Sequence, residues 1–369
     1  MRIAQVAPLA ESVPPKLYGG TERVISWLTE ELVSLGHEVT LFATGDSRTG
    51  ADLVPVWPRG LRLGRPKTDP AIPQTALLEA IGDRASEFDV IHCHTDWLQL
   101  PVLTRQSVPF VTTTHNRLDL PGLSNLVSRF PDAPFISISD NQRGPLPEAH
   151  WLGTVYHGLP IDAFQPSFAR GSYLAFLGRI TADKGPEAAI RIAQAARMPL
   201  RIAAKIPRAE HGYFNEKIKP MIDGDGVELI GEVNEQAKQD FLAGAAALLF
   251  PIEWPEPFGL VMIEAMACGT PIIAFASGSV PEVVENGATG FIIEGEAEAA
   301  EAVAKLDQID RRGVRARFEQ RFTAKRMALD YVRHYASLSA SPRPRLNMAG
   351  QPIPMPRRRP KRVSDPATG

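Results

Sequence analysis

The stretch EWPEPFGLVMIEAMACGTP, residues 253–271, is an apolar segment that opens with prolines. Pro257 suits the first turn of a helix, where a missing backbone N–H has no consequence, and Gly259 lets the backbone approach a ligand closely. We therefore expect a helix that begins near Phe258 and is packed between buried strands. Its N-terminal amide groups would carry partial positive charge and could bind a phosphate.

The same stretch carries two carboxylates, Glu256 before the expected helix start and Glu264 more than one turn inside it. A carboxylate accepts hydrogen bonds from hydroxyl groups in pairs, and sugar diols offer such pairs. Two glutamates on either side of a phosphate site therefore suit a ligand with a phosphate in the middle and a sugar at each end. The alternatives are that Glu256 only complements the helix dipole and that Glu264 lies on a solvated face.

Strands and helices alternate on both sides of this stretch. In the second half the alternation runs from SYLAFLG at 172–178 to FII at 291–293, and in the first half it starts with a strand at 3–7 and a helix at about 21–35. Short strands rich in Val, Ile and Thr, separated by longer connections, predict parallel sheets with crossover helices. We interpret the proline-rich segment 45–73 as a surface loop. Further strands are expected at 88–94, 109–115, 134–139 and 153–158.

Two such series predict an α/β fold with two Rossmann-like, doubly wound parallel sheets that face a cleft. A chain of 369 residues is also long enough for two domains. The expected division is an N-terminal domain at 1–160, a linker at 161–171, a second domain at 172–320, a C-terminal helix at 321–337 that can cross back to the first domain, and a disordered tail rich in Pro and Arg at 338–369.

The composition is that of an ordinary globular protein. The chain is 44% hydrophobic and 22% charged, with a formal net charge of -2, which argues against a nucleic-acid binder and against a disordered chain. Its 2 cysteines, Cys93 and Cys268, lie in different halves and do not form a disulfide framework. We find no signal-peptide pattern at the start and no apolar run of membrane-spanning length, and we expect a cytoplasmic protein.

Several motifs together resemble one enzyme family. EPFGLVMIE, with Glu256 and Glu264 in the spacing E-x7-E and followed by AMACGTPIIA, resembles the signature of the retaining, nucleotide-sugar-dependent glycosyltransferases of family 4, which have the two-domain GT-B fold. GRITADKG at 178–185, YGGTERV at 18–24, GHEVTLFA at 36–43 and SGSVPEVVENGATGFII at 277–293 are also similar to elements of this family. The resemblance covers nearly everything from residue 1 to about 335.

The resemblance implies that the second domain binds the nucleotide sugar and the first domain the acceptor. Arg179 and Lys184 would then bind the diphosphate, Glu264 the ribose and Glu256 the transferred sugar. Two fixed cations facing a helix N-terminus can stabilise a departing nucleoside diphosphate, which agrees with these roles. The alternative is that both cations are surface charges paired with neighbouring acids. The amide groups expected on the sugar or phosphate are those of Phe258, Gly259 and Leu260.

Other residues complete the expected site. Gly19 and Gly20 would let a backbone amide reach the diphosphate or the sugar, although without the resemblance an ordinary tight turn is the better explanation. Lys205 ends a strand at the same edge and is a further candidate for donor binding. By resemblance His115 contacts the transferred sugar and counts as catalytic. Asp96 could bind acceptor hydroxyl groups.

Two patterns suggest metal sites, and we prefer simpler explanations for both. His92 and His94 share one face of a strand, but no third ligand is placed by spacing, so a packed pair is the better interpretation. Asp223 and Asp225 match a D-x-D pattern but stand in a glycine-rich turn. No G-x-G-x-x-G motif is present, which argues against a nicotinamide dehydrogenase. The basic tail could attract anionic lipid, but we expect it to be solvated.

The expected function is transfer of a sugar from a nucleoside diphosphate to an acceptor hydroxyl with retention of anomeric configuration. The resemblance implies a mechanism without an enzyme nucleophile, in which stabilisation of the leaving group is the main contribution, and this mechanism requires no metal or other cofactor. The alternatives are a GT-B sugar phosphorylase or epimerase and a non-catalytic nucleotide-sugar-binding protein. The sequence specifies neither the donor, for which UDP-glucose is a guess, nor the acceptor, the linkage or the oligomeric state.

Overall fold

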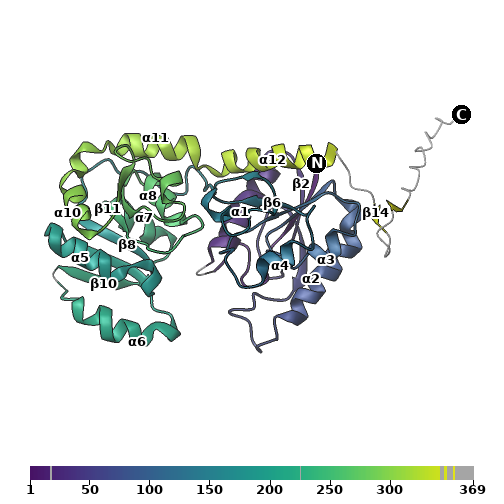
Figure 1. The fold of residues 1–369 in the computed structure, drawn as a ribbon, viewed down its shortest axis with the longest axis horizontal. Helices are drawn as coiled ribbons and strands as arrows, with labels where there is room; N and C mark the ends of the chain where they lie inside the picture. The colour runs from purple at the N-terminus through teal and green to yellow at the C-terminus, as the bar shows by residue number, and fades with distance from the viewer. Residues whose placement is uncertain (17–18, 225, 341–344, 347–351, 354–369) are drawn as a thin grey trace, which may run out of the picture.

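The structure, a computed structural model, describes residues 1–16, 19–224, 226–340, 345–346 and 352–353; most of the expected tail lies outside them. The described residues form two parallel sheets that lie side by side (Figure 1). Hydrophobic clusters pack on both faces of each sheet. The prediction of two doubly wound α/β domains is confirmed. No helix in this part of the chain combines the length and the apolarity needed to cross a bilayer.

The first sheet has seven parallel strands in the order β3-β2-β1-β4-β5-β6-β7. Its middle strands are buried on both faces, as in β1, where Ile3, Ala4, Gln5 and Val6 are all inaccessible to solvent. The strand order reverses between β1 and β4, the position at which open α/β sheets place their ligands. The bounds are β1 Arg2–Val6, β2 Glu38–Thr44, β3 Asp52–Trp57, β4 Val90–Cys93, β5 Phe110–Thr113, β6 Pro134–Ser137 and β7 His150–Thr154.

Helices cover both faces of this sheet. The helix α1 (Gly20–Ser34) buries Val24, Leu28 and Leu32 against one face, which confirms the apolar periodicity of this segment. The helix α2 (Ala71–Arg84) packs Leu77 and Ile81 on the other face. Two short helices, α3 (Leu100–Leu103) and α4 (Leu123–Val127), lie on the same side as α2.

The second sheet has six parallel strands in the order β10-β9-β8-β11-β12-β13. Helices α5 and α10 contribute to the cluster on one face, and α7, α8 and α11 contribute to the cluster on the other. The strands are β8 Tyr173–Arg179, β9 Leu200–Lys205, β10 Val227–Gly231, β11 Ala245–Phe250, β12 Ile272–Phe275 and β13 Gly290–Ile293. The helices are α5 Pro186–Ala196, α6 His211–Tyr213, α7 Glu235–Ala243, α8 Leu260–Ala267, α9 Val280–Val283, α10 Glu296–Ala304 and α11 Arg311–Arg321.

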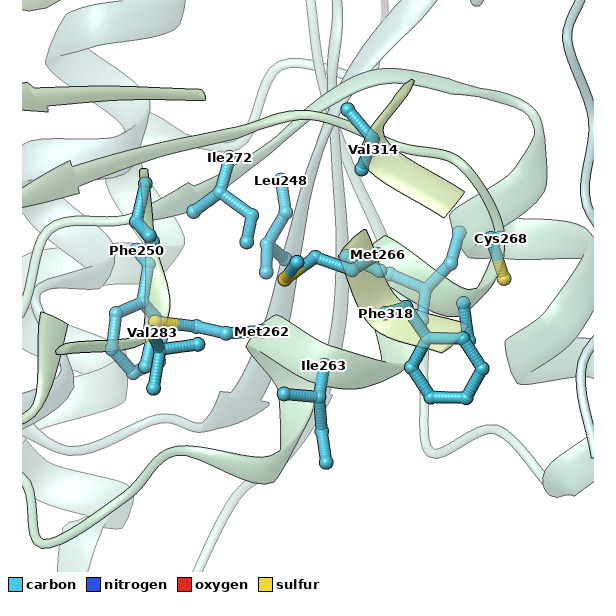
Figure 2. Close-up of a cluster of buried hydrophobic side chains, with 14 of the residues drawn as sticks. Leu248, Phe250, Met262, Ile263, Met266, Cys268, Ile272, Val283, Val314 and Phe318 are labelled. Atoms are coloured by element: carbon cyan, nitrogen blue, oxygen red, sulfur yellow. The ribbon is translucent and has the colours of Figure 1, made fainter. Parts of the chain in front are cut away.

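The helix α8, which the opening stretch predicts, is buried nearly all round. Its Met266 points toward Leu248 of the sheet and its Met262 toward Phe250, and Phe318 of α11 lies on the side opposite Phe250 (Figure 2). Six of its eight residues are buried, including Glu264. A helix without a solvated face is fixed in position, so its N-terminus is a rigid part of the site.

The helix α12 (Ala324–Ala340) returns the chain from the second domain to the first (Figure 1). Its Tyr331 and Tyr335 are buried in the cluster that also contains Val24 and Leu28 of α1. Where α12 begins, Leu159 and Thr323 form an isolated β-bridge. A last strand pair, β14 (Arg345–Leu346) and β15 (Pro352–Ile353), is antiparallel.

Three local expectations are wrong. The segment 45–73 contains the strand β3, which the prolines obscure; Pro55 is tolerated because β3 is an edge strand. The helix α8 begins at Leu260 and not near Phe258, because Gly259 has φ +77°, which is outside the helical region. The last strand of the first sheet is β7 at His150–Thr154 and not 153–158, so Tyr156 and His157 lie beyond the strand, where their rings contact Phe258 of the second domain.

Candidate active site

The two domains meet where α1 and α8 begin. A Cβ atom added to Gly20 would lie 3.4 Å from Cδ1 of Leu260, so the two helix starts face each other. Nearby, the guanidinium carbon of Arg117 lies 5.4 Å from the ring centre of Trp254. We call this region, defined by these four residues, the interdomain junction. Gly19 precedes α1, and a Cβ atom there would lie 2.8 Å from Cβ of Pro15, so a side chain at residue 19 would clash.

Three predicted cations stand at the carboxyl edge of the second sheet. Arg179 ends β8 and Lys205 ends β9, and the two residues are direct partners in the parallel pairing. Lys184 follows in a 3-10 turn just before α5. The strand β8 neighbours β11 at the point where the strand order reverses, which is where a phosphate-bearing ligand is expected.

Lys184 and Glu256 form an ion pair, Nζ to Oε2. Gly185 makes this possible: its φ is +69°, and a Cβ atom would lie 2.1 Å from the carbonyl oxygen of Pro251, so the turn packs directly on the loop that leads to Glu256. The Nζ of Lys184 also lies 4.8 Å from the ring centre of Trp254. The alternative pairing of Lys184 with a neighbouring acid is wrong, because its ion partner comes from 72 residues away.

The loop before α8 is braced by the segment 277–279, which we did not assign to the site. Gly278 has φ +57°, and a Cβ atom there would lie 2.4 Å from the backbone nitrogen of Glu256. The hydroxyl of Ser279 donates to the carbonyl of Phe258 at 2.7 Å, and its amide donates to the carbonyl of Glu256 at 3.1 Å. These contacts hold the amide groups at the start of α8 in place. The Ser-Gly-Ser sequence before an expected helix was the available signal.

Glu264 is buried and paired. Its Oε1 accepts a hydrogen bond from Nζ of Lys238 on α7 at 2.5 Å, so the alternative of a solvated face is wrong. Lys238 also lies 3.2 Å from Glu235, which in turn lies 3.2 Å from Arg23 of the first domain. A series of ion pairs therefore runs from Glu264 on α8 to Arg23 on α1. Sequence reasoning missed Lys238, because nothing in the chain order places α7 beside α8.

His115 follows β5 and lies among other histidines. Its Nε2 is 2.8 Å from Nδ1 of His94, and its ring stacks on His157 with centres 5.2 Å apart. The ring of His157 contacts Phe258 at 4.8 Å, which brings His115 close to the start of α8. Burial lowers the pKa of His115 to about 3, so the ring is neutral at ordinary pH. His157 is a neighbour that the sequence analysis did not single out.

Asp96 lies after β4 on the same side of the sheet. It has φ 55°, an uncommon backbone conformation for a residue other than glycine. Its Oδ2 accepts a hydrogen bond from the amide of Asn116 at 3.1 Å, and burial raises the pKa of its carboxyl group. Strained backbone of this kind is concentrated at functional sites.

The patterns that suggested metals have structural explanations. Nδ1 of His92 lies 2.6 Å from the hydroxyl of Tyr335, and its Nε2 lies 2.7 Å from Thr113, which matches the interpretation as a packed pair. Oδ1 of Asp223 accepts from the amides of Gly226 and Val227, each at 2.8 Å, as in a turn; Asp225 lies outside the described residues. Within the described part of the chain no cluster of three or more His, Cys, Asp or Glu is suited to a metal.

Several residues of the predicted site carry buried polar atoms that have no hydrogen-bond partner among the described residues. Buried side-chain nitrogen and oxygen atoms in folded proteins nearly always have a hydrogen-bond partner, and exceptions call for an explanation. By contrast, a surface hollow lined by Phe168, Met198 and Arg311 lies at the amino ends of the second sheet, away from the predicted site. Among the described residues, such atoms in the predicted site are Asp96 Oδ1, His115 Nδ1 and Arg179 Nε, and others in residues next to predicted ones in the sequence or in contact with them are Thr114 Oγ1, His157 Nδ1, Thr181 Oγ1 and Trp254 Nε1.

Comparisons with known proteins agree with this geometry. The family described as "Glycosyl transferases group 1" matches residues 161–322, and the one described as "Glycosyltransferase Family 4" matches residues 18–141. The chain belongs to the family 4 (group 1) glycosyltransferases. This enzyme class is the one that the E-x7-E motif and its companion motifs predicted.

Relatives and solved structures include other glycosyltransferases. A D-inositol 3-phosphate glycosyltransferase of Frankia alni is 28% identical over 353 residues, covering 79% of this chain and 85% of that enzyme. For the enzyme of the same name from Mycobacterium sp. strain KMS, the match is 27% identical and covers 56% of each chain. The glycosyltransferase AviGT4, involved in avilamycin A biosynthesis, has a TM-score of 0.70 at 26% identity and covers 92% of this chain and 98% of its own.

The structure of Anabaena HepE in complex with UDP-glucose has a TM-score of 0.70 at 17% identity, covering 91% of this chain and 100% of its own, and therefore shows a shared fold. The glycosyltransferase described here thus has the GT-B architecture, as predicted.

Proposed function

We propose that this glycosyltransferase moves a sugar from a nucleoside diphosphate to an acceptor hydroxyl group with retention of anomeric configuration. The observation that carries the proposal is the Lys184–Glu256 ion pair, which stands between the end of β8 and the start of α8. It combines a cation suited to a phosphate and a carboxylate suited to sugar hydroxyl groups.

The donor would lie along the second domain, at 172–320, with the helix start of α8 under its diphosphate. Arg179 and Lys184 neutralise the diphosphate, and Lys205, the strand partner of Arg179, adds positive charge. Glu256 binds hydroxyl groups of the transferred sugar. The backbone amides of Phe258, Gly259 and Leu260 point toward the donor, and Gly19 and Gly20 bring backbone from the first domain.

The ribose would be bound at Glu264. Lys238 holds one oxygen of this carboxylate at 2.5 Å and leaves the other to accept from the ribose hydroxyl groups. Lys238 also forms an ion pair with Glu235, which in turn forms an ion pair with Arg23 on α1. Ribose binding and contact between the domains therefore involve the same series of ion pairs.

In the reaction the nucleoside diphosphate leaves, and Arg179, Lys184 and the amides at the start of α8 stabilise its developing charge. The departing phosphate oxygen takes the proton of the acceptor hydroxyl, which attacks from the same face. His115 is neutral and contacts the transferred sugar as a hydrogen-bonding group, not as an acid. The contacts at the interdomain junction exclude water, which would otherwise compete as acceptor.

The acceptor would bind to the first domain, 1–160, near Asp96 and the segment 45–73. Oδ1 of Asp96 is buried without a partner among the described residues, so it is available to an acceptor hydroxyl group. Since named relatives act on D-inositol 3-phosphate, that compound is the first acceptor to test. We also propose a reducing, cytoplasmic environment, supported by Cys93 and Cys268, which are both buried and unpaired.

A thermal-shift screen of nucleotide sugars, including UDP-glucose, tests donor binding, since a ligand that binds the native state raises the apparent Tm. With the donor in hand, Lys184→Met should lower kcat/KM by about 100-fold or more, in line with the loss of one group that stabilises the transition state. Lys305→Met is the matched control, because Lys305 is exposed and pairs only loosely with Glu301 at 3.7 Å. Near-normal activity of Lys184→Met would overturn the assignment.

Two outcomes would favour the alternatives. Release of nucleoside diphosphate without any acceptor, or consumption of inorganic phosphate, indicates an epimerase or a phosphorylase. Saturable binding without turnover across a broad acceptor panel indicates a binding protein. The anomeric configuration of the product, measured by NMR coupling constants, tests retention directly.

A further inference from the structure

A row of four histidines runs from the interior of the first domain to Phe258, which precedes α8 in the second domain. The ring centres of His92 and His94 are 4.0 Å apart, those of His94 and His115 are 5.1 Å apart, and those of His115 and His157 are 5.2 Å apart. His92, His94 and His157 are buried. The proposed function uses only His115, so the polar groups behind it need an explanation of their own.

Hydrogen-bond distances give this network a direction. Nε2 of Gln5 lies 3.2 Å from the hydroxyl of Tyr335, which suits an N–H donor, whereas bonds from O–H donors are shorter. The same hydroxyl lies 2.6 Å from Nδ1 of His92, which suits an O–H donor. Tyr335 therefore accepts from Gln5 and donates to His92. The side-chain oxygen of Gln5 is left to face Nε2 of His94 at 2.9 Å.

The direction fixes the tautomers of the next two rings. His94 must carry its hydrogen on Nε2 to donate to Gln5, so its Nδ1 is an acceptor. Nε2 of His115, 2.8 Å from that acceptor, must carry the hydrogen of the second ring. Burial lowers the pKa of both rings, so neither holds a second proton at ordinary pH. Nδ1 of His115 is then a bare lone pair, shielded from solvent and without a partner among the described residues.

We propose that Gln5 and His94 are positioning residues that hold His115 in its Nε2–H tautomer, so that Nδ1 accepts a hydrogen bond from a ligand hydroxyl group at the junction. The identification of that ligand as the transferred sugar rests on the proposed function. The tautomer itself follows from contacts within the first domain. The site would then favour donor sugars that offer a hydroxyl at this place over analogues that lack it.

NMR measures the tautomer directly. Long-range 1H–15N spectra of the full chain labelled with 15N-histidine distinguish a protonated from an unprotonated ring nitrogen, and His115→Asn identifies the signals of His115. We expect Nε2 to be protonated and Nδ1 unprotonated. The reverse pattern, or averaged signals in the unaltered protein, would overturn the proposal.

Variants at Gln5 separate positioning from folding. Gln5→Met removes the acceptor for His94 and should average the His115 signals, whereas Gln5→Glu keeps an oxygen at the same place and should preserve the single tautomer. Thermal unfolding shows whether each variant is folded. A single, unchanged His115 tautomer in folded Gln5→Met would contradict the proposal.

Binding of two probes supplies the functional readout. Gln5→Met should weaken UDP-glucose about twofold or more by calorimetry, because only the fraction of molecules with His115 in the Nε2–H tautomer can accept the hydrogen bond. It should leave UDP unchanged, because UDP lacks the sugar. Equal effects on both probes, or no effect on either, would overturn the link from tautomer to sugar. A protein that binds neither probe has a donor with another base, and the NMR spectra then decide the tautomer alone.

Discussion

Replacing Lys238 with methionine would leave the carboxylate of Glu264 buried without its cation. In the ion pair the side chains of Lys238 and Glu264 expose only 11% and 7% of their surface. Removing one partner of a buried pair typically costs about 3–5 kcal/mol. We expect the lower end, about 3 kcal/mol, because the Lys238 side chain is not fully shielded.

That loss is large enough to measure. At about 2–4 °C per kcal/mol for a domain of this size, about 3 kcal/mol corresponds to a fall in Tm of about 6–12 °C. The assay is thermal unfolding by circular dichroism without ligand, so donor binding does not enter. The double variant Lys238→Met with Glu264→Gln removes the isolated charge and should regain at least half of the loss, since it no longer buries an unpaired ion.

A fall in Tm below about 2 °C for Lys238→Met would show that Glu264 reaches solvent or another cation. Strictly additive losses in the double variant would show that the two side chains do not interact. Arg191→Met is a matched control, because Arg191 forms an exposed ion pair with Glu296, of the kind that contributes about 0–1 kcal/mol.

Three further predictions concern catalysis and domain contact. Gly185→Ala should lower kcat/KM at least about tenfold, because the added methyl group forces Lys184 away from Glu256. Gly287→Ala is the control: Gly287 also has a positive φ but has open space around it, so kcat/KM should be unchanged. The pKa of His115 is lowered to about 3, so the ring stays neutral from pH 5 to pH 8. The pH profile of kcat/KM should therefore show no titration from this ring in that range. A step in that profile which His115→Asn abolishes would contradict this. Glu282→Ala removes acceptors for backbone amides of the first domain and should increase the radius of gyration in X-ray scattering, whereas an unchanged radius would show that these contacts do not hold the domains together.

The fold could be predicted because it depends on local patterns. The apolar spacing of Val24, Leu28 and Leu32 defines the buried face of α1, and repeated strand–helix alternation defines two parallel sheets. The strand β3 was missed because Pro55 lies within it, and an edge position, which removes the objection to proline, is a property of the whole sheet.

The site, like the fold, could be predicted where it depends on the order of the elements and not where it depends on how they pack. Arg179 and Lys205 end neighbouring strands, so their shared edge follows from the order of the elements. The partner of Glu264 could not be predicted in this way, because the 2.5 Å contact with Lys238 depends on how α7 packs on α8. The alignment of His94 with His115 likewise depends on the pairing of β4 with β5, and His157 reaches them only because β7 ends at Thr154. The catalytic roles stay predictions until variants are measured.

The return of α12 to the first domain affects how the protein is made. During translation the first sheet is complete at β7, but Tyr331 and Tyr335, which cover Val24, Leu28 and their neighbours, emerge from the ribosome only after the second domain has been synthesised. Until then an apolar surface of the first domain remains open to water and to other chains. A nascent or truncated chain that ends before residue 324 is therefore expected to bind chaperones or aggregate, even though all seven strands of its first sheet are present.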